Sequence, residues 1–237
     1  MSRWDSLLSV QEHDTHADQL AHRRRSLPAR GELDAAMAAL SVLEQRVLEV
    51  QANRHELGRA QQRLEDEIAS LNDRAAQHDK TLYGGSITNP RELQALQEEI
   101  GSLKRRISHL EDQELELMEE IEPLDAELAQ MDGQRVALDE RSVALRAQIA
   151  EEEVAIDDEL AAVVAERASL AADVEPELLT EYEELRPQSG GIAIARLVGS
   201  SCGGCHLALS AVEIDRIKRL PPDEPVHCEE CGRLLAR

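Results

Sequence analysis

The feature that most constrains this chain is a run of apolar residues, spaced by three or four positions, from Leu93 to Ile156. Its apolar members are Leu93, Leu96, Ile100, Leu103, Ile107, Leu110, Leu117, Ile121, Leu124, Leu128, Met131, Leu138, Leu145, Ile149 and Ile156. This spacing keeps them on one side of a helix over roughly nine heptads, which is the pattern of a coiled coil. Pro123 lies inside the run and is expected to kink the helix without changing its register.

The preceding segment shows the same rhythm, so we expect a second long helix. The apolar residues on one side of this helix, which we call its seam, are Leu43, Val47, Val50, Leu57, Leu64, Ile68, Leu71, Ala75 and Leu82. A further helix over residues 3–27 should end at Pro28. Between the two long segments lies Tyr83-Gly-Gly-Ser-Ile-Thr-Asn-Pro90, whose glycines and Asn-Pro pair indicate a turn. Asn89 can cap the next helix, with Glu92 completing a capping box, so the long helices should form an antiparallel hairpin.

Composition argues against a large globular core. The 237 residues include no Phe, one Trp and two Tyr, although aromatic side chains usually dominate core energetics. Acidic residues number 48 against 26 basic residues, and residues 83–190 alone carry 28 acidic and 9 basic side chains. Such a strongly negative helix repels phosphate backbones. Two basic clusters stand out, Arg23–Arg25 with Arg30 and Lys104–Arg106. Either could contact nucleic acid or an acidic partner, but we expect both to pair with acidic residues of the neighbouring helix.

The sequence predicts a cytoplasmic protein. No run approaches 18 apolar residues, which excludes a helical membrane span. The first residues contain no apolar stretch typical of a secretory signal. In the reducing cytoplasm the four cysteines are expected to bind a metal rather than to form disulfides.

The cysteines form two C-x-x-C pairs, Cys202-Gly-Gly-Cys205 and Cys228-Glu-Glu-Cys231. This arrangement predicts one structural Zn²⁺ with Cys202, Cys205, Cys228 and Cys231 as its ligands. Four cysteine ligands leave no open position for catalysis at the metal. A redox dithiol and free thiols are the alternatives, and His206 and His227 are interpreted as flanking residues because the sulfur set is complete.

The pattern changes after a short helix bracketed by Pro176 and Pro187. Gln188-Ser-Gly-Gly191 is expected to be a flexible joint. Alternation over residues 192–198 predicts a strand, and Ser210 can cap a short helix that Pro221 stops. We therefore expect a mainly α protein, with a long antiparallel coiled-coil hairpin over residues 1–187 (turn at 83–90, kinks near 28 and 123). A small β-containing C4 zinc ribbon should follow over residues 188–237.

These parts together resemble the bacterial coiled-coil hairpin proteins with a C-terminal C4-type zinc ribbon. The stretches that carry the resemblance are residues 82–100, Leu8-Ser-Val-Gln11 with Asp14, and Cys228-Glu-Glu-Cys-Gly-Arg-Leu-Leu235. The resemblance runs essentially end to end and implies a kinked hairpin with the ribbon near its open end. It also implies a regulatory or nucleic-acid-binding role, and it points to transcription, secretion or flagellar machinery as partners. This chain ends in Ala236-Arg237, where such proteins often carry an aromatic residue after the last leucine.

Our first hypothesis is a non-enzymatic adaptor that binds protein partners through the hairpin and the ribbon. The candidate contact residues lie at the turn: Tyr83, Ile87, Asn89 and Arg91. No G-x-S-x-G motif, phosphate-binding loop or nucleophile–base spacing is present, so we expect neither catalysis nor a small-molecule substrate.

The alternative hypothesis is a nucleic-acid-binding ribbon that recognises RNA or DNA. Its candidate phosphate contacts are Arg196, Arg216, Lys218, Arg219, Arg233 and Arg237. Residues 191–237 nevertheless carry six basic and six acidic side chains and no aromatic residue. Base stacking on aromatic rings is therefore unavailable, which makes this hypothesis the weaker one.

Overall fold

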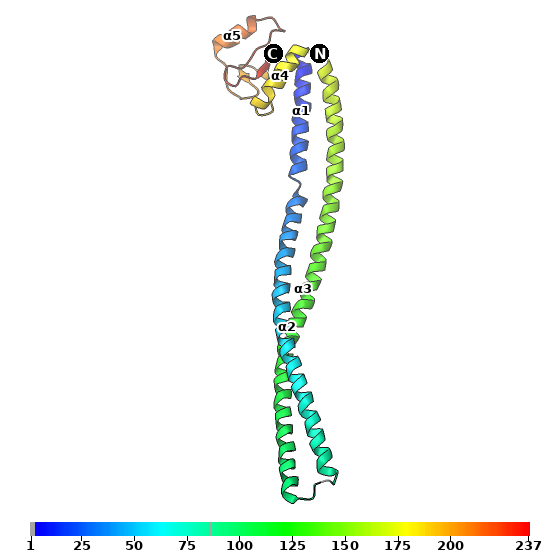
Figure 1. Ribbon diagram of the computed structural model, residues 1–237. Coiled ribbons are helices and arrows are strands. Elements are labelled where there is room, and N and C mark those ends of the chain that lie inside the picture. The colour runs from blue at the N-terminus through cyan, green and yellow to red at the C-terminus, as the bar shows by residue number, and fades with distance from the viewer. Residues whose placement is uncertain (1–2, 86) are drawn as a thin grey trace. The chain divides into compact units, whose positions relative to one another are not determined.

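The computed structural model describes residues 3–85 and 87–237 as a mainly α chain in which a long helical hairpin precedes a small strand region (Figure 1). The helices and strands are α1 (Arg3–Arg25), α2 (Pro28–Tyr83), α3 (Pro90–Ala172), α4 (Pro176–Gln188), β1 (Ile194–Val198), β2 (Ser201–Cys202), α5 (Ala211–Arg219) and β3 (Leu234–Ala236). Contacts divide the chain into two compact units. The first holds the chain up to Glu32 together with Leu145–Arg237, and the second holds Leu33–Ala144. The domain boundary expected at residue 188 stays a prediction.

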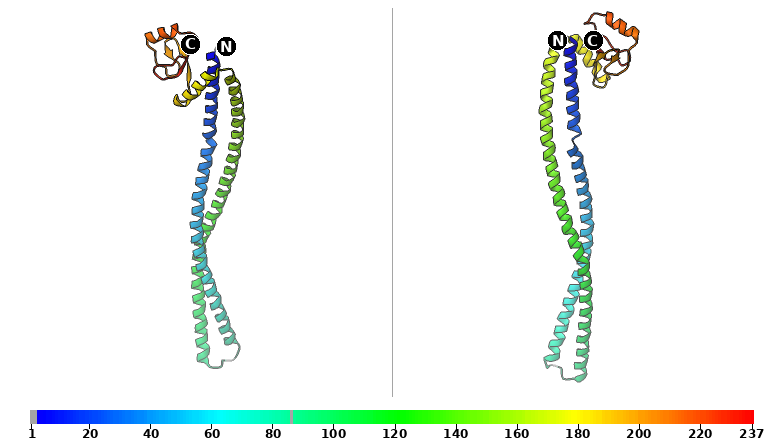
Figure 2. Two further views of the ribbon diagram at one scale, coloured as in Figure 1. Left: turned by 45° about the horizontal axis from the view of Figure 1, so that its top comes forward. Right: turned by 180° about the vertical axis from the view of Figure 1, so that it is seen from behind.

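Within Leu33–Ala144, α2 and α3 run side by side in opposite directions (Figure 2). Every predicted seam residue of this unit is buried or half-buried, and Leu110 is among the most deeply buried. The periodic pattern therefore identified the packed faces of both helices. α3 continues through Pro123, which is exposed, so the carbonyl that the proline leaves without a hydrogen bond can be solvated.

Ion pairs border this seam on both helices. Arg46 pairs with Glu127 at 3.0 Å and Arg54 with Asp125 at 3.0 Å. The expected pairing of the Lys104–Arg106 cluster with α2 is confirmed, for example by Arg106 and Glu67 at 3.0 Å. All of these side chains are partly solvated, and ion pairs of this kind contribute little to the free energy of unfolding. The buried seam therefore provides most of the stability.

Asn89 caps α3 as the sequence predicts. Its Oδ1 accepts a hydrogen bond from the Arg91 N–H at 3.1 Å, which satisfies one of the free amides of the first turn. Glu92 contributes differently from a standard capping box, because its carboxylate accepts from the Asn89 side-chain amide at 3.2 Å. The turn itself uses Gly85, whose φ of 72° lies in the left-handed region.

The ribbon contains a three-stranded sheet in the order β2-β1-β3. β1 is antiparallel to β2, with Leu197 opposite Cys202, and parallel to β3, with Ile194 opposite Leu234. The strand predicted over residues 192–198 corresponds to β1. The predicted cap of α5 is also present, because the Ser210 hydroxyl accepts from the N–H of Glu213.

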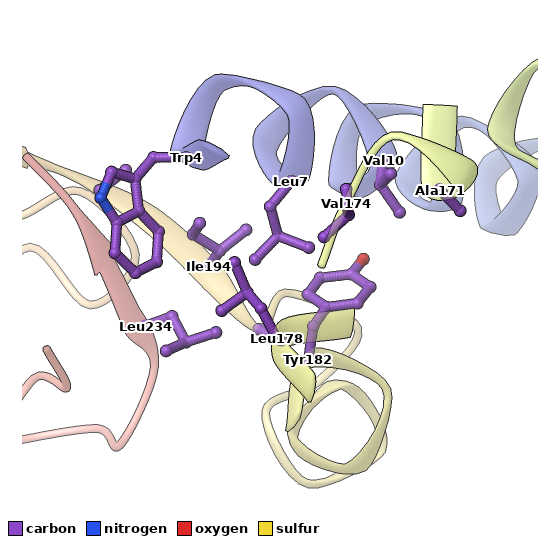
Figure 3. Packing of buried hydrophobic residues seen from close by; sticks show 11 residues of the cluster. Trp4, Leu7, Val10, Ala171, Val174, Leu178, Tyr182, Ile194 and Leu234 are labelled. Carbon is purple, nitrogen blue, oxygen red and sulfur yellow. The ribbon is translucent and has the colours of Figure 1, made fainter. Parts of the chain in front are cut away.

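The ribbon and the ends of the helices share one hydrophobic core. Side chains on one face of α1, including Trp4, Leu7 and Val10, point toward β1, β3 and α4 (Figure 3). Trp4, the single tryptophan, is 3% exposed, and Tyr182 of α4 is fully buried. Two of the three aromatic residues of the chain therefore lie where the ribbon meets the helices.

Among the described residues, none of the helices has both the length and the apolar character that a membrane span requires.

Candidate metal centre and its support

The two C-x-x-C turns have the same backbone geometry. The N–H of His206 donates to the carbonyl of Cys202, and the N–H of Gly232 donates to the carbonyl of Cys228, both at 2.8 Å. His206 and Gly232 occupy equivalent places after each second cysteine and both have positive φ, 61° and 73°. Glycine suits this conformation best, and histidine is among the residues that tolerate it.

Gly203 and Gly204 are required because of close packing, not because of a left-handed backbone. Neither has a positive φ. A Cβ at Gly203 would lie 2.8 Å from the Arg196 carbonyl of β1, and one at Gly204 would lie 2.7 Å from the Arg233 side chain. The first cysteine pair is therefore packed directly against β1, and only glycine fits this close approach.

The four cysteine sulfurs lie within 4.8 Å of one another. The Sγ atoms of Cys202 and Cys231 are 3.9 Å apart, and those of Cys205 and Cys228 are 3.8 Å apart. Four sulfurs held tetrahedrally at about 2.3 Å from zinc are separated by about 3.8 Å. The cluster fits one structural zinc ion, and all four predicted ligands come together. His206 and His227 lie outside this sulfur cluster.

The thiols of this cluster differ in acidity. Burial raises the pKa of Cys228 to about 12. Burial also acts on Cys231, but hydrogen bonds from the backbone and side chain of Arg233 and from the neighbouring thiols outweigh it and lower the pKa of Cys231 to about 7. Zinc ligands are thiolates, so metal binding requires these protons to leave.

Arg233 is one of the predicted phosphate contacts, yet its guanidinium is hydrogen-bonded within the chain. Its Nε donates to the carbonyl of Ile192 at 2.8 Å, and its Nη2 donates to the carbonyl of Ser189 at 2.7 Å. It therefore fixes the segment that enters the ribbon, and its side chain also lies beside Cys231, whose pKa it lowers. Sequence reasoning missed this structural role.

Most of the other predicted phosphate contacts also have partners within the chain. Arg196 pairs with Asp5 at 3.3 Å, and Arg216 forms a two-pronged pair with Glu213. Arg219 pairs with Asp215, while Arg237 donates to carbonyls that include Ile217 at 2.7 Å. Lys218 is exposed on α5. Their assignment to nucleic acid stays a prediction.

The predicted partner-binding residues lie at the turn between α2 and α3. Tyr83 is 83% exposed, Asn89 and Arg91 are exposed, and Ile87 is half-buried. Asn89 is occupied by its capping bonds. Tyr83, Ile87 and Arg91 therefore remain the residues of this set that are best suited to contact another molecule.

Gln11 of α1 holds the entry to the ribbon. This side chain is 5% exposed. Its amide nitrogen donates to the carbonyl of Gly191 at 2.8 Å, and its amide oxygen accepts from the N–H of Ala193 at 2.7 Å. The side chain thus pairs with the backbone as a neighbouring strand would, which satisfies polar groups that the shared core buries.

Asp14, one turn further along α1, anchors α4. Its carboxylate accepts from the hydroxyl of Tyr182 at 2.8 Å and from Nε of Arg167 at 3.2 Å. Arg186 adds a bond to the Asp14 carbonyl at 3.1 Å. Burial, together with the Asp14 carboxylate, raises the pKa of Tyr182, so its hydroxyl stays protonated and acts as a donor.

Two further contacts attach the ribbon to the helices. The indole N–H of Trp4 donates to the carbonyl of Pro222 at 2.9 Å. His227, beside a metal ligand, pairs with Glu181 of α4 at 2.8 Å. The metal centre is therefore supported by polar contacts from α1 and α4 in addition to the core.

Comparison with known families agrees with this arrangement. The model of the CT398-like coiled-coil hairpin domain matches residues 10–190, and that of the C4-type zinc ribbon domain matches residues 201–235. The chain belongs to the CT398-like coiled-coil hairpin family. The resemblance seen in the sequence is thereby confirmed, and the Gln11 and Asp14 motif that contributed to it has a structural explanation.

Relatives of this CT398-like chain match it nearly end to end. The uncharacterised protein Rv2229c of Mycobacterium tuberculosis is 32% identical over 232 residues, which cover 98% of this chain and 94% of the relative. A structurally characterised Mycobacterium smegmatis protein has a TM-score of 0.86 at 27% identity and covers 100% and 97% of the two chains. CT398 of Chlamydia trachomatis has a TM-score of 0.69 at 22% identity and covers 99% and 97%, a likeness that shows the fold alone.

Proposed function

We propose that the protein is a non-enzymatic cytoplasmic adaptor that binds protein partners through its hairpin and its zinc ribbon. The observation that carries this proposal is the exposure of large apolar side chains on helices that are otherwise highly charged. Tyr83 is 83% exposed, Val42 68% and Met37 49%. Exposed apolar groups of this size, surrounded by polar residues, are typical of protein contact surfaces when they cluster.

The metal centre favours a structural rather than a catalytic role for the ribbon. Its four sulfur ligands fill the coordination positions of one zinc ion, so no position is open to a substrate. A coiled-coil hairpin joined to such a ribbon provides long surfaces on which other proteins can bind, which favours a non-catalytic role.

The charges of the ribbon favour a protein partner over RNA or DNA. Arg216 and Arg233 are engaged within the chain, by a carboxylate and by backbone carbonyls respectively. Binding a phosphate with these groups would require breaking those contacts first. The acidic hairpin would also repel a nucleic acid that approached along it.

Photocrosslinking from the hairpin tip tests the proposal. A photoreactive phenylalanine analogue would replace Tyr83 in the full-length, zinc-loaded protein, and the same analogue at Val154 of α3, which is 62% exposed, serves as the matched control. We expect discrete protein adducts from position 83 and none of these from position 154. An additional Arg91→Ala change should reduce the adducts at least tenfold if the tip holds an interface hot spot. Identical adducts from both positions, or adducts with nucleic acid alone, would contradict the proposal.

A further inference from the structure

An apolar groove lies between α2 and α3 in the unit Leu33–Ala144. It has a volume of about 890 Å³. It is lined by Ala38, Ala39, Val42, Leu43, Arg46, Glu127, Met131, Gln134, Ala137 and Leu138, and seven of these ten side chains are apolar. The lining extends over residues 127–138 of α3, which at 1.5 Å per residue corresponds to about 17 Å, or three helical turns.

On the α2 side of the groove, apolar residues extend past those that pack against α3. Residues 35–43 read Ala-Ala-Met-Ala-Ala-Leu-Ser-Val-Leu and contain no charged side chain. A helix with a single packed face normally carries polar residues on the opposite side. Here Met37 is 49% exposed and Val42 68% exposed, while only Ala36 is fully buried among the small residues. This segment of α2 therefore has apolar surface for a second packing partner in addition to α3.

The small side chains of the groove suit a helical occupant. Alanine at positions 38, 39 and 137 leaves room for another helix to approach, because the separation of packed helices depends on the side chains at their contact. Three turns with an apolar floor match an amphipathic helix that presents a stripe of larger residues.

The charges around the groove indicate which charged residues should flank the apolar stripe of that helix. Residues 33–46 and 127–141 carry six acidic and three basic side chains. The basic ones include Arg46, which pairs with Glu127, and Arg135, which pairs with Asp132. The whole unit Leu33–Ala144 carries 24 acidic and 12 basic residues, a net charge of −12. A second copy of this chain would bring the same negative charge, whereas a basic helix would be attracted.

We propose that the groove docks an amphipathic helix of a partner protein, with a stripe of large apolar residues flanked by lysine and arginine. This inference rests on the proposed adaptor function and adds a binding site and a partner chemistry to it. The site is distinct from the tip residues around Tyr83, because it lies more than ten turns away along α2.

Fluorescence anisotropy with synthetic peptides tests the proposal on the full-length, zinc-loaded protein. The first probe is a labelled helical peptide of about 18 residues with leucines at heptad spacing and lysine or arginine beside them. A scrambled peptide of the same composition reports general attraction to an acidic protein. A third peptide keeps the leucine stripe but carries glutamate in place of the basic residues.

Two matched variants locate the binding. Val42→Lys places a charge in the groove, and Leu48→Lys places the same charge on α2 at a residue that is equally exposed but does not line it. Both positions are exposed, and lysine is a good helix former, so both variants should fold, as circular dichroism would verify. We expect the basic stripe peptide to bind saturably, Val42→Lys to weaken it at least tenfold and Leu48→Lys to change it less than twofold.

Four results would overturn the docking proposal. These are no saturable binding of the stripe peptide, equal binding of the scrambled or the glutamate peptide, equal effects of the two lysine variants, and a concentration-dependent dimer that Val42→Lys dissociates. The last result would identify a second copy as the occupant. Each of them leaves the crosslinking test at Tyr83 unaffected, so failure of the groove and failure of the adaptor function can be told apart.

Discussion

Replacing Cys228 with serine is expected to release the zinc ion and unfold the ribbon while most of the helical signal persists. Structural zinc contributes about 10 to 16 kcal/mol of apparent binding free energy, as large as the whole stability of a typical domain. The ribbon strands are only two to five residues long, and β1 carries both pairings of the sheet. Without metal, we expect this short sheet and its partly buried thiol cluster to come apart.

Trp4 provides a direct readout of that unfolding. It is the only tryptophan, and its indole packs in the core that α1 shares with the ribbon. Its fluorescence emission should shift to longer wavelength in Cys228→Ser, while the bound zinc falls to a small fraction of one equivalent. The seam of Leu33–Ala144 does not involve the ribbon, so the far-ultraviolet circular dichroism should keep most of its helical amplitude. Ser200→Ala is the control, and full zinc occupancy in Cys228→Ser would contradict the ligand assignment.

Replacing Tyr182 with alanine is expected to be the most damaging change outside the metal centre. The ring is fully buried among residues of α1, α3 and α4 and of the strands. Removing a buried aromatic side chain costs about 3 to 5 kcal/mol, because transfer free energy is lost and a cavity remains. Asp14 would in addition lose its hydroxyl donor. Denaturant unfolding of the zinc-loaded protein, followed by Trp4 fluorescence, should show a clearly lower midpoint.

Two tyrosine variants separate the contributions to this effect. Tyr182→Phe keeps the ring and removes only the bond to Asp14, so it should cost about 1 to 3 kcal/mol. Tyr83→Ala removes the only other tyrosine, which is 83% exposed, and should leave the midpoint unchanged. An unchanged midpoint for Tyr182→Ala would show that the ribbon is not held by the shared core.

The features that the sequence predicted correctly are those encoded by local spacing. The heptad pattern from Leu93 onward identified the packed face of α3, because helical periodicity places such residues on one side regardless of the partner. The C-x-x-C pairs identified the zinc ligands, because two tight turns bring paired sulfurs to the spacing that zinc requires. The caps at Asn89 and Ser210 depend on residues only two or three positions away.

The features that could not be predicted depend on contacts between distant parts of the sequence. Gln11 pairs with backbone 180 and 182 residues away, and Tyr182 reaches Asp14 across 168 residues. The residues next to Gln11 and Asp14 in the sequence carry no signal that indicates these distant partners. Gln188–Gly191 has the composition of a flexible joint, yet Gln11 and Arg233 bind its carbonyls. Only the family resemblance indicates that the motif around Gln11 and Asp14 matters to the fold.

The most direct test of the central claim is a salt-titrated anisotropy measurement of the full-length, zinc-loaded protein against labelled single-stranded RNA and duplex DNA. Our account predicts no saturable binding even at low salt, because the ribbon arginines are engaged within the chain and the hairpin is strongly acidic. Saturable binding that weakens with salt by about 0.7 to 0.9 log units per phosphate contact, for each tenfold rise in salt, would contradict it. That result would identify a nucleic acid, rather than a protein, as the molecule that the ribbon binds.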